Sequence, residues 1–160
     1  RMTSRCVSDA VIVRLARPAD YDAWLPLWLG YNAFYGRSGP TAPAEAVTRL
    51  TWRRFFDALE PMDCLVAEAE GRLVGLAHLI FHRNTSLAGS TCYLQDLFAA
   101  PDLRGRGVGR ALIAALYDHA RAAGAERVYW HTHETNAQAR RLYDQVAGHG
   151  GFLLYRKDLA

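Results

Sequence analysis

Pro101-Asp-Leu-Arg-Gly-Arg-Gly-Val-Gly-Arg110 is the stretch that says most about the fold of this 160-residue chain. It joins residues 91–99, predicted as a strand, to residues 108–123, whose apolar pattern predicts a helix. Three glycines at alternate positions allow the backbone to approach a ligand closely, and the helix N-terminus adds free N–H groups with a partial positive charge. The stretch therefore predicts a strand–loop–helix unit suited to a diphosphate.

Two better-known phosphate-binding motifs do not fit this loop. Counted from Gly105, the dinucleotide fingerprint requires glycine or alanine where Arg110 stands, and the lysine-containing P-loop has no counterpart because the loop lacks lysine. A glycine turn without any ligand is the structural alternative. Positive charge around a ligand would come from Arg104, Arg106 and Arg110.

Upstream of the loop the chain alternates between helical and extended patterns. We expect a strand at residues 11–16, a helix at 19–35, a glycine- and proline-rich loop at 36–43 and a second helix at 45–59. Strands at 64–68 and 73–81 would form a hairpin around Glu70-Gly71.

Downstream, a strand at residues 127–131 precedes a helix that starts at the capping box Thr135-Asn-Ala-Gln138 and runs to about residue 147. A final strand is predicted at residues 152–157. The whole order predicts a mixed α/β fold with one central, partly antiparallel sheet and helices on both faces.

Length and composition exclude several classes. A chain of 160 residues with 51% hydrophobic and 22% charged residues is typical of one globular domain, which we place at residues 11–160 after a disordered or tag-derived N-terminus at 1–10. There is no apolar run of about 18 residues and no signal-peptide pattern, so we expect a cytoplasmic protein without membrane partners. A net charge of +3 is low for a nucleic-acid binder.

Cysteine and histidine spacing predicts no metal site. Cys6, Cys64 and Cys92 are an odd number without metal-type spacing, which indicates small core residues in a reducing compartment. His131 and His133 share one face of a predicted strand, but no third ligand has a suitable spacing.

Arg104-x-x-Gly107-x-Gly109, between a strand and a helix, resembles the acetyl-CoA loop of the GNAT N-acetyltransferase superfamily. Tyr93-Leu-Gln-Asp-Leu-Phe98 precedes it as the family's fourth strand does, and Asn136 and Tyr143 follow as its cofactor-lining residue and general acid do. The order of elements is similar from about residue 11 to 159. Within the superfamily, Gly75-Leu-Ala-His78 and Trp130-His-Thr-His-Glu-Thr-Asn136 look most like the branch with polyamine acetyltransferases and the yeast histone or D-amino-acid acetyltransferases.

The resemblance implies acetyl-CoA as the cofactor and a defined set of residues around it. Asn136 and Tyr143 are seven residues apart, within about 20° on a helix, so both can line one groove, and Ala139 between them leaves room for a pantetheine arm. Backbone N–H groups at residues 97–99 would bind the acetyl oxygen, and Tyr143 would donate to the departing thiolate. The implied cofactor-binding residues are Leu97, Phe98, Ala99, Arg104, Gly105, Arg106, Gly107, Val108, Gly109, Arg110, Asn136, Ala139 and Tyr143.

The group that removes the proton from the acceptor stays open. Gln95 stands where the polyamine enzymes have a glutamate, and an amide accepts a hydrogen bond but takes no proton. Asp96 is a catalytic candidate beside it, and His133 or Glu134 acting through water are others. Alternation puts Gln95 and Asp96 on opposite strand faces unless a bulge intervenes, and Asp96 is at least as well explained as a structural carboxylate.

The expected activity is direct transfer of the acetyl group to a primary amine, because no cysteine near the loop could carry it. Gln95, Tyr31 and Tyr35 are the candidate substrate-binding residues, the two tyrosines through cation–π attraction. The acceptor is a small amine, a polyamine or an amino acid in preference to a protein lysine. The alternative is a non-catalytic acyl-CoA-binding regulatory module, and in either case aromatic surface near the first two helices suggests a homodimer.

Overall fold

The computed structural model describes residues 10–160. Residues 1–9, with Cys6 and nearly all of the predicted disordered or tag-derived N-terminus, lie outside the described part. Within the described part, no helix is long and apolar enough to cross a membrane.

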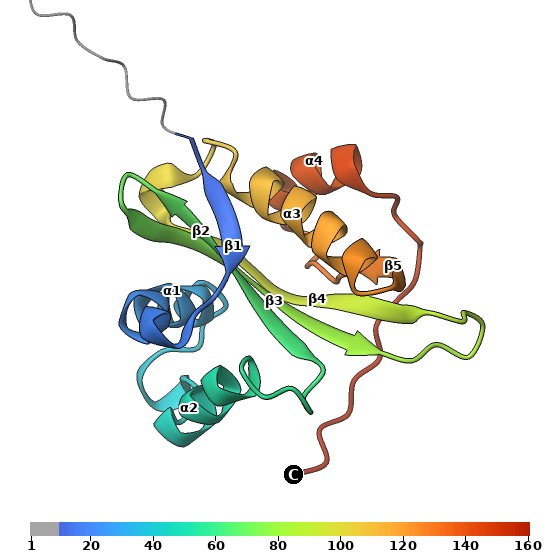
Figure 1. Ribbon diagram of the computed structural model, residues 1–160, viewed down its shortest axis with the longest axis horizontal. Coiled ribbons are helices and arrows are strands. Elements are labelled where there is room, and N and C mark those ends of the chain that lie inside the picture. Colours follow the sequence, from blue (N-terminus) through green and yellow to red (C-terminus); the bar gives the residue numbers. More distant parts are fainter. Residues whose placement is uncertain (1–9) are drawn as a thin grey trace, which may run out of the picture.

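A five-stranded sheet forms the centre of the molecule (Figure 1). Its strands follow the order of the sequence, and the first four are antiparallel, whereas the last pairs parallel with the fourth. They are β1 (Ile12–Leu15), β2 (Met62–Ala69), β3 (Arg72–His82), β4 (Ser90–Ala99) and β5 (Ala125–Tyr129).

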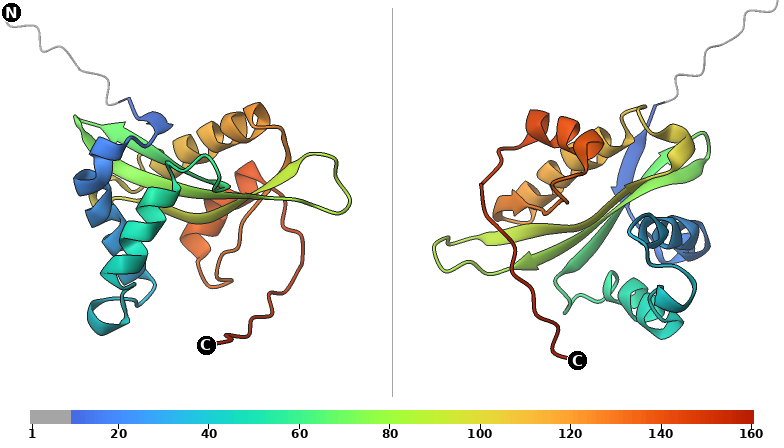
Figure 2. Two further views of the ribbon diagram at one scale, coloured as in Figure 1. Left: turned by 60° about the horizontal axis from the view of Figure 1, so that its bottom comes forward. Right: turned by 180° about the vertical axis from the view of Figure 1, so that it is seen from behind.

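Helices cover both faces of this sheet, as Figures 1 and 2 show. On one face lie α1 (Tyr21–Phe34) and α2 (Glu45–Arg54), while α3 (Val108–Ala122) crosses the other face and connects β4 to β5. The last helix is α4 (Ala137–Val146). Short 3-10 turns occupy Pro18–Asp20, Gly39–Thr41 and Pro101–Leu103. The mixed, partly antiparallel sheet with helices on both faces confirms the predicted fold class.

The core has two halves, one on each face of the sheet. On one face, α1 buries Trp24, Trp28 and Tyr31 against the sheet. On the other face, α3 buries Val108, Leu112, Ile113, Leu116 and Ala120. The periodicity predicts Val108, Leu112 and Leu116 correctly, whereas His119 and Ala123, which it places on the same face, are not buried. Gly75 of β3 lets α3 lie very close, because a Cβ at that position would come within 2.8 Å of the Val108 side chain.

Three predicted boundaries are wrong by a few residues. The helix predicted at 45–59 ends at Arg54, because Phe55 turns into the core and Asp57 Oδ1 accepts the Leu59 N–H, which closes a turn. The helix predicted from Thr135 begins one residue later, with Asn136 as its N-cap. The strand predicted at 127–131 ends at Tyr129, so His131 and His133 lie in a loop and share no strand face.

The strand predicted at 152–157 is a larger error. These residues are extended but form no strand, and they are exposed. A strand requires a neighbouring edge with which to pair, and the segment after α4 passes behind β4 in Figure 1 without pairing with any of the five strands.

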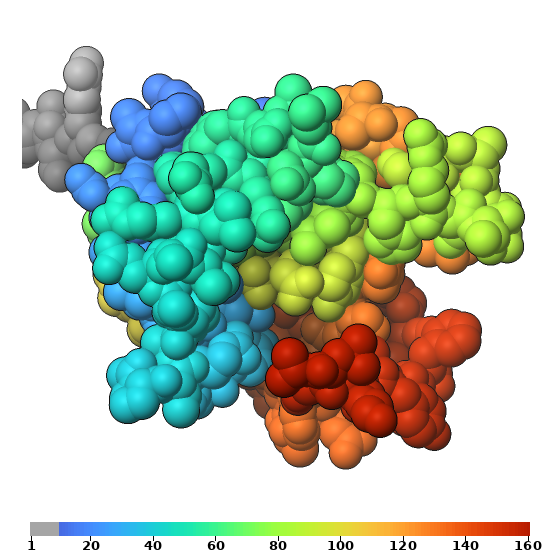
Figure 3. Space-filling view, turned by 90° about the horizontal axis from the view of Figure 1, so that it is seen from below, coloured from blue at the N-terminus to red at the C-terminus, as the bar shows by residue number. Residues whose placement is uncertain are grey.

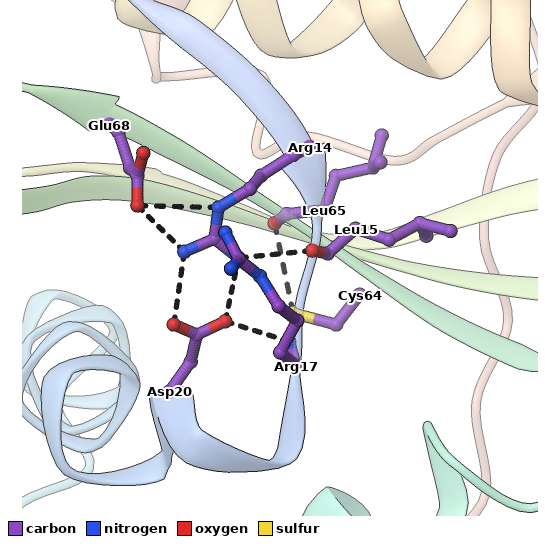
Figure 4. A network of polar contacts seen from close by, with 7 residues as sticks. All are labelled: Arg14, Leu15, Arg17, Asp20, Cys64, Leu65 and Glu68. Atoms are coloured by element: carbon purple, nitrogen blue, oxygen red, sulfur yellow. Dashed lines mark hydrogen bonds and ion pairs between the residues drawn. The ribbon is translucent and has the colours of Figure 1, made fainter.

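One polar network anchors the N-terminal edge of the sheet (Figure 4). The Arg14 guanidinium donates to both carboxylate oxygens of Asp20, over 2.7 and 3.0 Å, and also to Glu68 of β2, over 2.7 and 3.2 Å. Asp20 in turn accepts the Arg17 N–H over 2.7 Å. These contacts hold β1, the turn before α1 and β2 together, and they lower the pKa of Asp20, with the Arg14 hydrogen bonds as the main cause.

We expect Asp20→Asn to lower the free energy of unfolding at pH 7 by about 1.5–3 kcal/mol, since it removes charged hydrogen bonds from a largely buried carboxylate. Because the pKa of Asp20 is lower in the folded state, its carboxylate stabilises the fold fully at pH values above its unfolded-state pKa of about 4. This stabilisation disappears as the pH falls through the pKa of the folded state. Urea unfolding at several pH values should therefore show the two proteins converging in acid. The matched control Asp118→Asn, in an exposed pair with Arg121, should change stability by less than about 0.5 kcal/mol at any pH, and a constant difference for Asp20→Asn would contradict the ionic explanation.

Candidate active site

A cavity of about 390 Å³ opens where β4 and β5 diverge. Its walls come from the second half of β4, the glycine loop with the start of α3, one side of α4 and the end of α1. Thirteen of its lining residues were singled out from the sequence. These are Tyr35, Leu97, Phe98, Ala99, Arg104, Gly105, Gly107, Val108, Gly109, Arg110, Asn136, Ala139 and Tyr143.

The pairing between β4 and β5 explains why a cavity exists. The two strands pair from Ser90 with Ala125 to Tyr93 with Tyr129, and β5 then ends while β4 continues to Ala99. Among the described residues, β4 therefore has β3 as its only strand neighbour from Leu94 onward. Since Ala100 N–H donates to Val74 on the β3 side, alternation directs the N–H groups of Leu97 and Ala99 toward the cavity.

The glycine loop presents a second set of N–H groups. Gly105 and Gly107 have φ values of +82° and +81°, a left-handed conformation that side chains rarely adopt, and a Cβ at either position would meet no atom within 4 Å. The first hydrogen bond of α3 joins Ala111 N–H to Gly107 C=O over 2.9 Å, which leaves the amides of residues 108–110 without a helical partner. This geometry, at the positive end of a helix, suits an anion.

The arginines around the loop have different positions. Arg104 and Arg110 line the cavity, the first with its guanidinium over the rings of Phe34 and Phe98 and the second in a hydrogen bond to Gln145. Arg106 does not line the cavity, and its guanidinium lies 3.5 Å from Glu70.

The α4 wall carries the predicted pair Asn136 and Tyr143, with Ala139 between them. Asn136 Oδ1 caps the helix by accepting the Ala139 N–H, so its amide nitrogen stays available as a donor. The Tyr143 ring packs edge-on against Trp130, with centroids 5.3 Å apart. Burial, together with the nearby Tyr35, raises the pKa of Tyr143 to about 12, so its hydroxyl is protonated at neutral pH.

A β-bulge separates the two neighbouring candidates on β4. His78 pairs with Asp96 and Leu79 with Leu94, which leaves Gln95 as the extra residue. Gln95 is exposed, whereas Asp96 is 8% exposed and faces α1. Neither side chain lines the cavity directly.

Asp96 belongs to a buried polar chain that runs back into the core. The Trp24 indole N–H donates to His78 Nε2 over 3.0 Å, so the ring proton of His78 is on Nδ1, which donates to Asp96 over 2.8 Å. The Tyr31 hydroxyl donates to the same carboxylate, and burial with this contact raises the pKa of Tyr31 well above its usual range. Asp96 is therefore a carboxylate with fixed partners, and Tyr31 connects it to the aromatic wall of the cavity.

Tyr31 and Tyr35 occupy different environments. Tyr31 is buried under α1, whereas Tyr35 is half-exposed and lines the cavity, and their ring centroids are 5.0 Å apart. The guanidinium of Arg37 lies 5.8 and 5.7 Å from the two ring centroids, in the position that we expected an acceptor amine to take. Its Nε donates to Asn32 Oδ1 over 2.9 Å, and its two Nη groups have no hydrogen-bond partner among the described residues.

Several residues of the site were missed by the sequence analysis. Gln138, Arg141, Leu142 and Gln145 of the α4 wall are three or four residues apart from one another but not from Asn136 or Tyr143, so helical spacing from that pair does not find them. Arg37 lies in the loop after α1, where no periodic pattern exists, and the contact of His78 with Asp96 depends on the strand register. No group of three His, Cys, Asp or Glu residues within residues 10–160 could hold a metal ion.

Comparisons with known proteins agree on one family. The sequence profile of the acetyltransferase (GNAT) family matches residues 24–149. D-amino-acid N-acetyltransferase HPA3 of Saccharomyces cerevisiae is 32% identical over 156 residues, which are 96% of this chain and 94% of that protein. The aminoglycoside N(6')-acetyltransferase type 1 of Stenotrophomonas maltophilia is 30% identical over 86% of this chain and 85% of its own.

Solved structures share the fold at low sequence identity. A transcriptional regulator from Bacillus halodurans C-125 superposes with a TM-score of 0.80 at 15% identity, over 94% of this chain and all of that chain. AAC(6')-Iy in complex with the bisubstrate analogue CoA-S-monomethyl-acetylneamine superposes with a TM-score of 0.78 at 17% identity. The superposition covers 94% of this chain and 99% of that chain.

Proposed function

The chain belongs to the acetyltransferase (GNAT) family, and from this premise we propose that it transfers the acetyl group of acetyl-CoA directly to the amine of an amino acid or a similar small amine. One observation carries the proposal. A single cavity joins the glycine loop, the unpaired half of β4, Tyr143 and Tyr35, and the Arg37 guanidinium lies over the Tyr35 ring outside the cavity lining.

The diphosphate of acetyl-CoA would bind at the glycine loop. The amides of residues 108–110 supply donors, and Arg104 and Arg110 supply charge. The pantetheine arm would then lie between β4 and α4, where Ala139 is small and the Asn136 amide can donate. Bound there, acetyl-CoA supplies the thioester that is attacked.

Chemistry would take place where β4 lacks its neighbour. The N–H groups of Leu97 and Ala99 are placed to bind the thioester oxygen and to stabilise the negative charge that it gains. The Tyr143 hydroxyl donates to the departing thiolate. Because its pKa of about 12 lies above the value of about 8.5 for a thiol, a hydrogen bond during C–S cleavage is favoured over complete proton transfer.

We propose that Asp96 accepts the proton of the acceptor amine through the Tyr31 hydroxyl. The amine proton would pass to the Tyr31 oxygen as the Tyr31 hydroxyl proton passes to Asp96. Neither Tyr31 nor the candidates His133 and Glu134 line the cavity, but the Tyr31 ring packs against two residues that do, Tyr35 and Phe98, and Gln95 cannot take a proton. Direct transfer is favoured because both described cysteines, Cys64 and Cys92, are buried core residues, and burial raises the pKa of the Cys92 thiol to about 12.

Arg37 selects among the acceptors. A guanidinium that already occupies the cation–π position repels a polyamine but pairs with a carboxylate, and its two free Nη groups can donate one hydrogen bond to each carboxylate oxygen. An α-amino acid supplies both the carboxylate and the amine. The name of the yeast relative, a D-amino-acid N-acetyltransferase, supports the same class of acceptor.

The Arg37 assignment is tested with pairs of acceptors that differ in one group. We expect amino acids to be acetylated with a higher kcat/KM than the amines that lack their carboxylate, and Arg37→Gln to reduce the amino-acid value about 10- to 100-fold with little effect on the simple amines. Thiol release measures the rate, and Arg53→Gln on α2 is the control. Equal losses on both kinds of acceptor would remove Arg37 from the carboxylate site, and turnover of no amine would favour the non-catalytic acyl-CoA-binding module.

Cofactor binding is tested at Gly107. In the parent, acetyl-CoA at 100 times its dissociation constant should stabilise the fold by about 2.7 kcal/mol, and Gly107→Val should abolish this stabilisation. Gly71→Val is the matched control, since its φ of +73° and open surroundings give similar backbone strain away from the cavity. Thermal unfolding with and without ligand gives the result, and full stabilisation of a folded Gly107→Val protein would refute the site.

The thiolate donor is tested by Tyr143→Phe, which keeps the ring against Trp130. We expect acetyl-CoA affinity to stay within a few-fold while the single-turnover rate falls by about 10²–10⁴. Because the pKa of Tyr143 is about 12, ionisation of this residue should not reduce the parent rate up to pH 10. Tyr129→Phe is the matched control, because it also loses one hydroxyl, and it should keep the parent rate. A Tyr143→Phe protein that also keeps the parent rate would show that water protonates the thiolate.

A further inference from the structure

His78 of β3 is a buried ionisable side chain that takes no proton in the proposed reaction. It is 2% exposed, and the rings of Trp24, Trp28 and Phe55 surround it, with centroids 5.8, 5.2 and 4.8 Å from its own. Seen from below, the blue to teal residues of α1, α2 and the loop between them form one closely packed layer (Figure 3). Protein groups, and not solvent, therefore determine the hydrogen bonds of the imidazole.

These hydrogen bonds permit one tautomer of the His78 ring. An indole N–H can only donate, so the His78 Nε2 that accepts it from Trp24 over 3.0 Å carries no proton. The ring proton is on Nδ1, which donates to Asp96 Oδ2 over 2.8 Å. A second proton on Nε2 would break the first bond and leave the indole N–H in the core without an acceptor, which is costly. The imidazole is therefore held as a neutral donor.

A neutral donor suits a carboxylate that must take up a proton. A cation beside Asp96 would favour its charged form and make it a weaker base. No arginine or lysine within residues 10–160 forms a salt bridge with Asp96. Four other ionisable side chains interact with Asp96, and all are neutral at neutral pH because burial raises the pKa of each above its usual range. They are Cys64, which pairs with His78 across β2 and β3, Tyr31, Tyr35 and Tyr93.

We infer that Trp24 and His78 are positioning residues for the proton transfer to Asp96. Trp24 fixes the tautomer of His78, and His78 holds the Asp96 carboxylate beside Tyr31 without adding a positive charge. As the Tyr31 hydroxyl proton passes to Asp96, the imidazole keeps its Nδ1 proton, so the transferred proton stops at the carboxylate and later leaves by the same route. The inference rests on the role proposed for Asp96, and variants at the three positions distinguish the two.

Nitrogen-15 resonances of histidine test the tautomer in the parent protein. At neutral pH we expect His78 to show a protonated Nδ1 and an unprotonated Nε2, and to keep this state down to about pH 5, where a solvated histidine carries both protons. The exposed His149 is the reference for a histidine in contact with solvent. A His78 ring that carries a proton on Nε2 at neutral pH would overturn the inference.

Trp24→Phe frees Nε2 of His78 while it keeps a ring in the aromatic layer. We expect the His78 ring of this variant to gain a second proton as the pH falls and to form an ion pair with Asp96. The single-turnover rate should fall with it, by about 10- to 100-fold at the acidic end, while acetyl-CoA affinity stays within a few-fold. Trp28→Phe is the matched control, because the Trp28 indole donates to Thr48 and not to His78, and it should keep the parent rate and the parent tautomer.

Substitutions of His78 separate its hydrogen bonds from its volume. His78→Gln keeps an amide donor for Asp96 and an amide acceptor for Trp24 and cannot become charged, so it should retain the parent rate within a few-fold. His78→Leu fills a similar volume but loses both bonds, so the rate should fall about 10- to 100-fold, the value of one hydrogen bond to a charged group. A loss in His78→Gln as large as that in His78→Leu would contradict the inference.

Asp96→Asn distinguishes failure of the inference from failure of the proposed proton route. If Asp96→Asn keeps the parent rate, the route itself is wrong and the inference falls with it. If Asp96→Asn is slow while folded His78→Leu and Trp24→Phe proteins keep the parent rate at every pH, the route stands and Trp24 and His78 are structural residues only. Circular dichroism establishes that each variant is folded, and where a variant is not, the tautomer in the parent protein decides.

Discussion

The early end of the pairing between β4 and β5 is the constraint on which the rest of this molecule depends. Backbone N–H and C=O groups need partners, and beyond Tyr93 one side of β4 loses them. The structure surrounds this unpaired backbone with groups that can hold a ligand: the left-handed glycines before α3, the Asn136 cap of α4 and the aromatic end of α1. A ligand with its own acceptors is the natural partner for the free amides, which is why the cavity lies there.

The bulge at Gln95 has an equally large effect on the opposite side of β4. One extra residue lets Asp96 face α1 in register with His78, where Trp24 and Tyr31 complete its surroundings. A buried carboxylate is costly unless it is hydrogen-bonded, and these partners satisfy it. The same contacts connect the hydrophobic core to the cavity wall, so the packing of α1 and the position of Asp96 cannot vary independently.

Local patterns and non-local contacts explain which parts of the molecule could be predicted. The glycine loop, the stripe of α3 and the seven-residue spacing on α4 are local signals. The structure brings the glycine loop and the α4 pair to one cavity and packs the stripe of α3 on the sheet. The contact of His78 with Asp96 depends on a one-residue bulge, and the position of Arg37 depends on an irregular loop, so neither could be read from spacing. The strand predicted at residues 152–157 is absent because an apolar, extended pattern says nothing about which edge is available to it.

The placement of the four tryptophans has an optical consequence. Trp24, Trp28 and Trp52 form one cluster beside His78, in which the ring centroids of Trp52 and Trp28 lie 4.7 and 5.9 Å from that of Trp24. Trp28 stacks on Tyr31, which packs against the cavity-lining Phe98, and Trp130 packs directly against the cavity-lining Tyr143. The intrinsic emission of this protein is for that reason concentrated around its site, so changes in the quenching or wavelength of that emission sense the cavity without any added label.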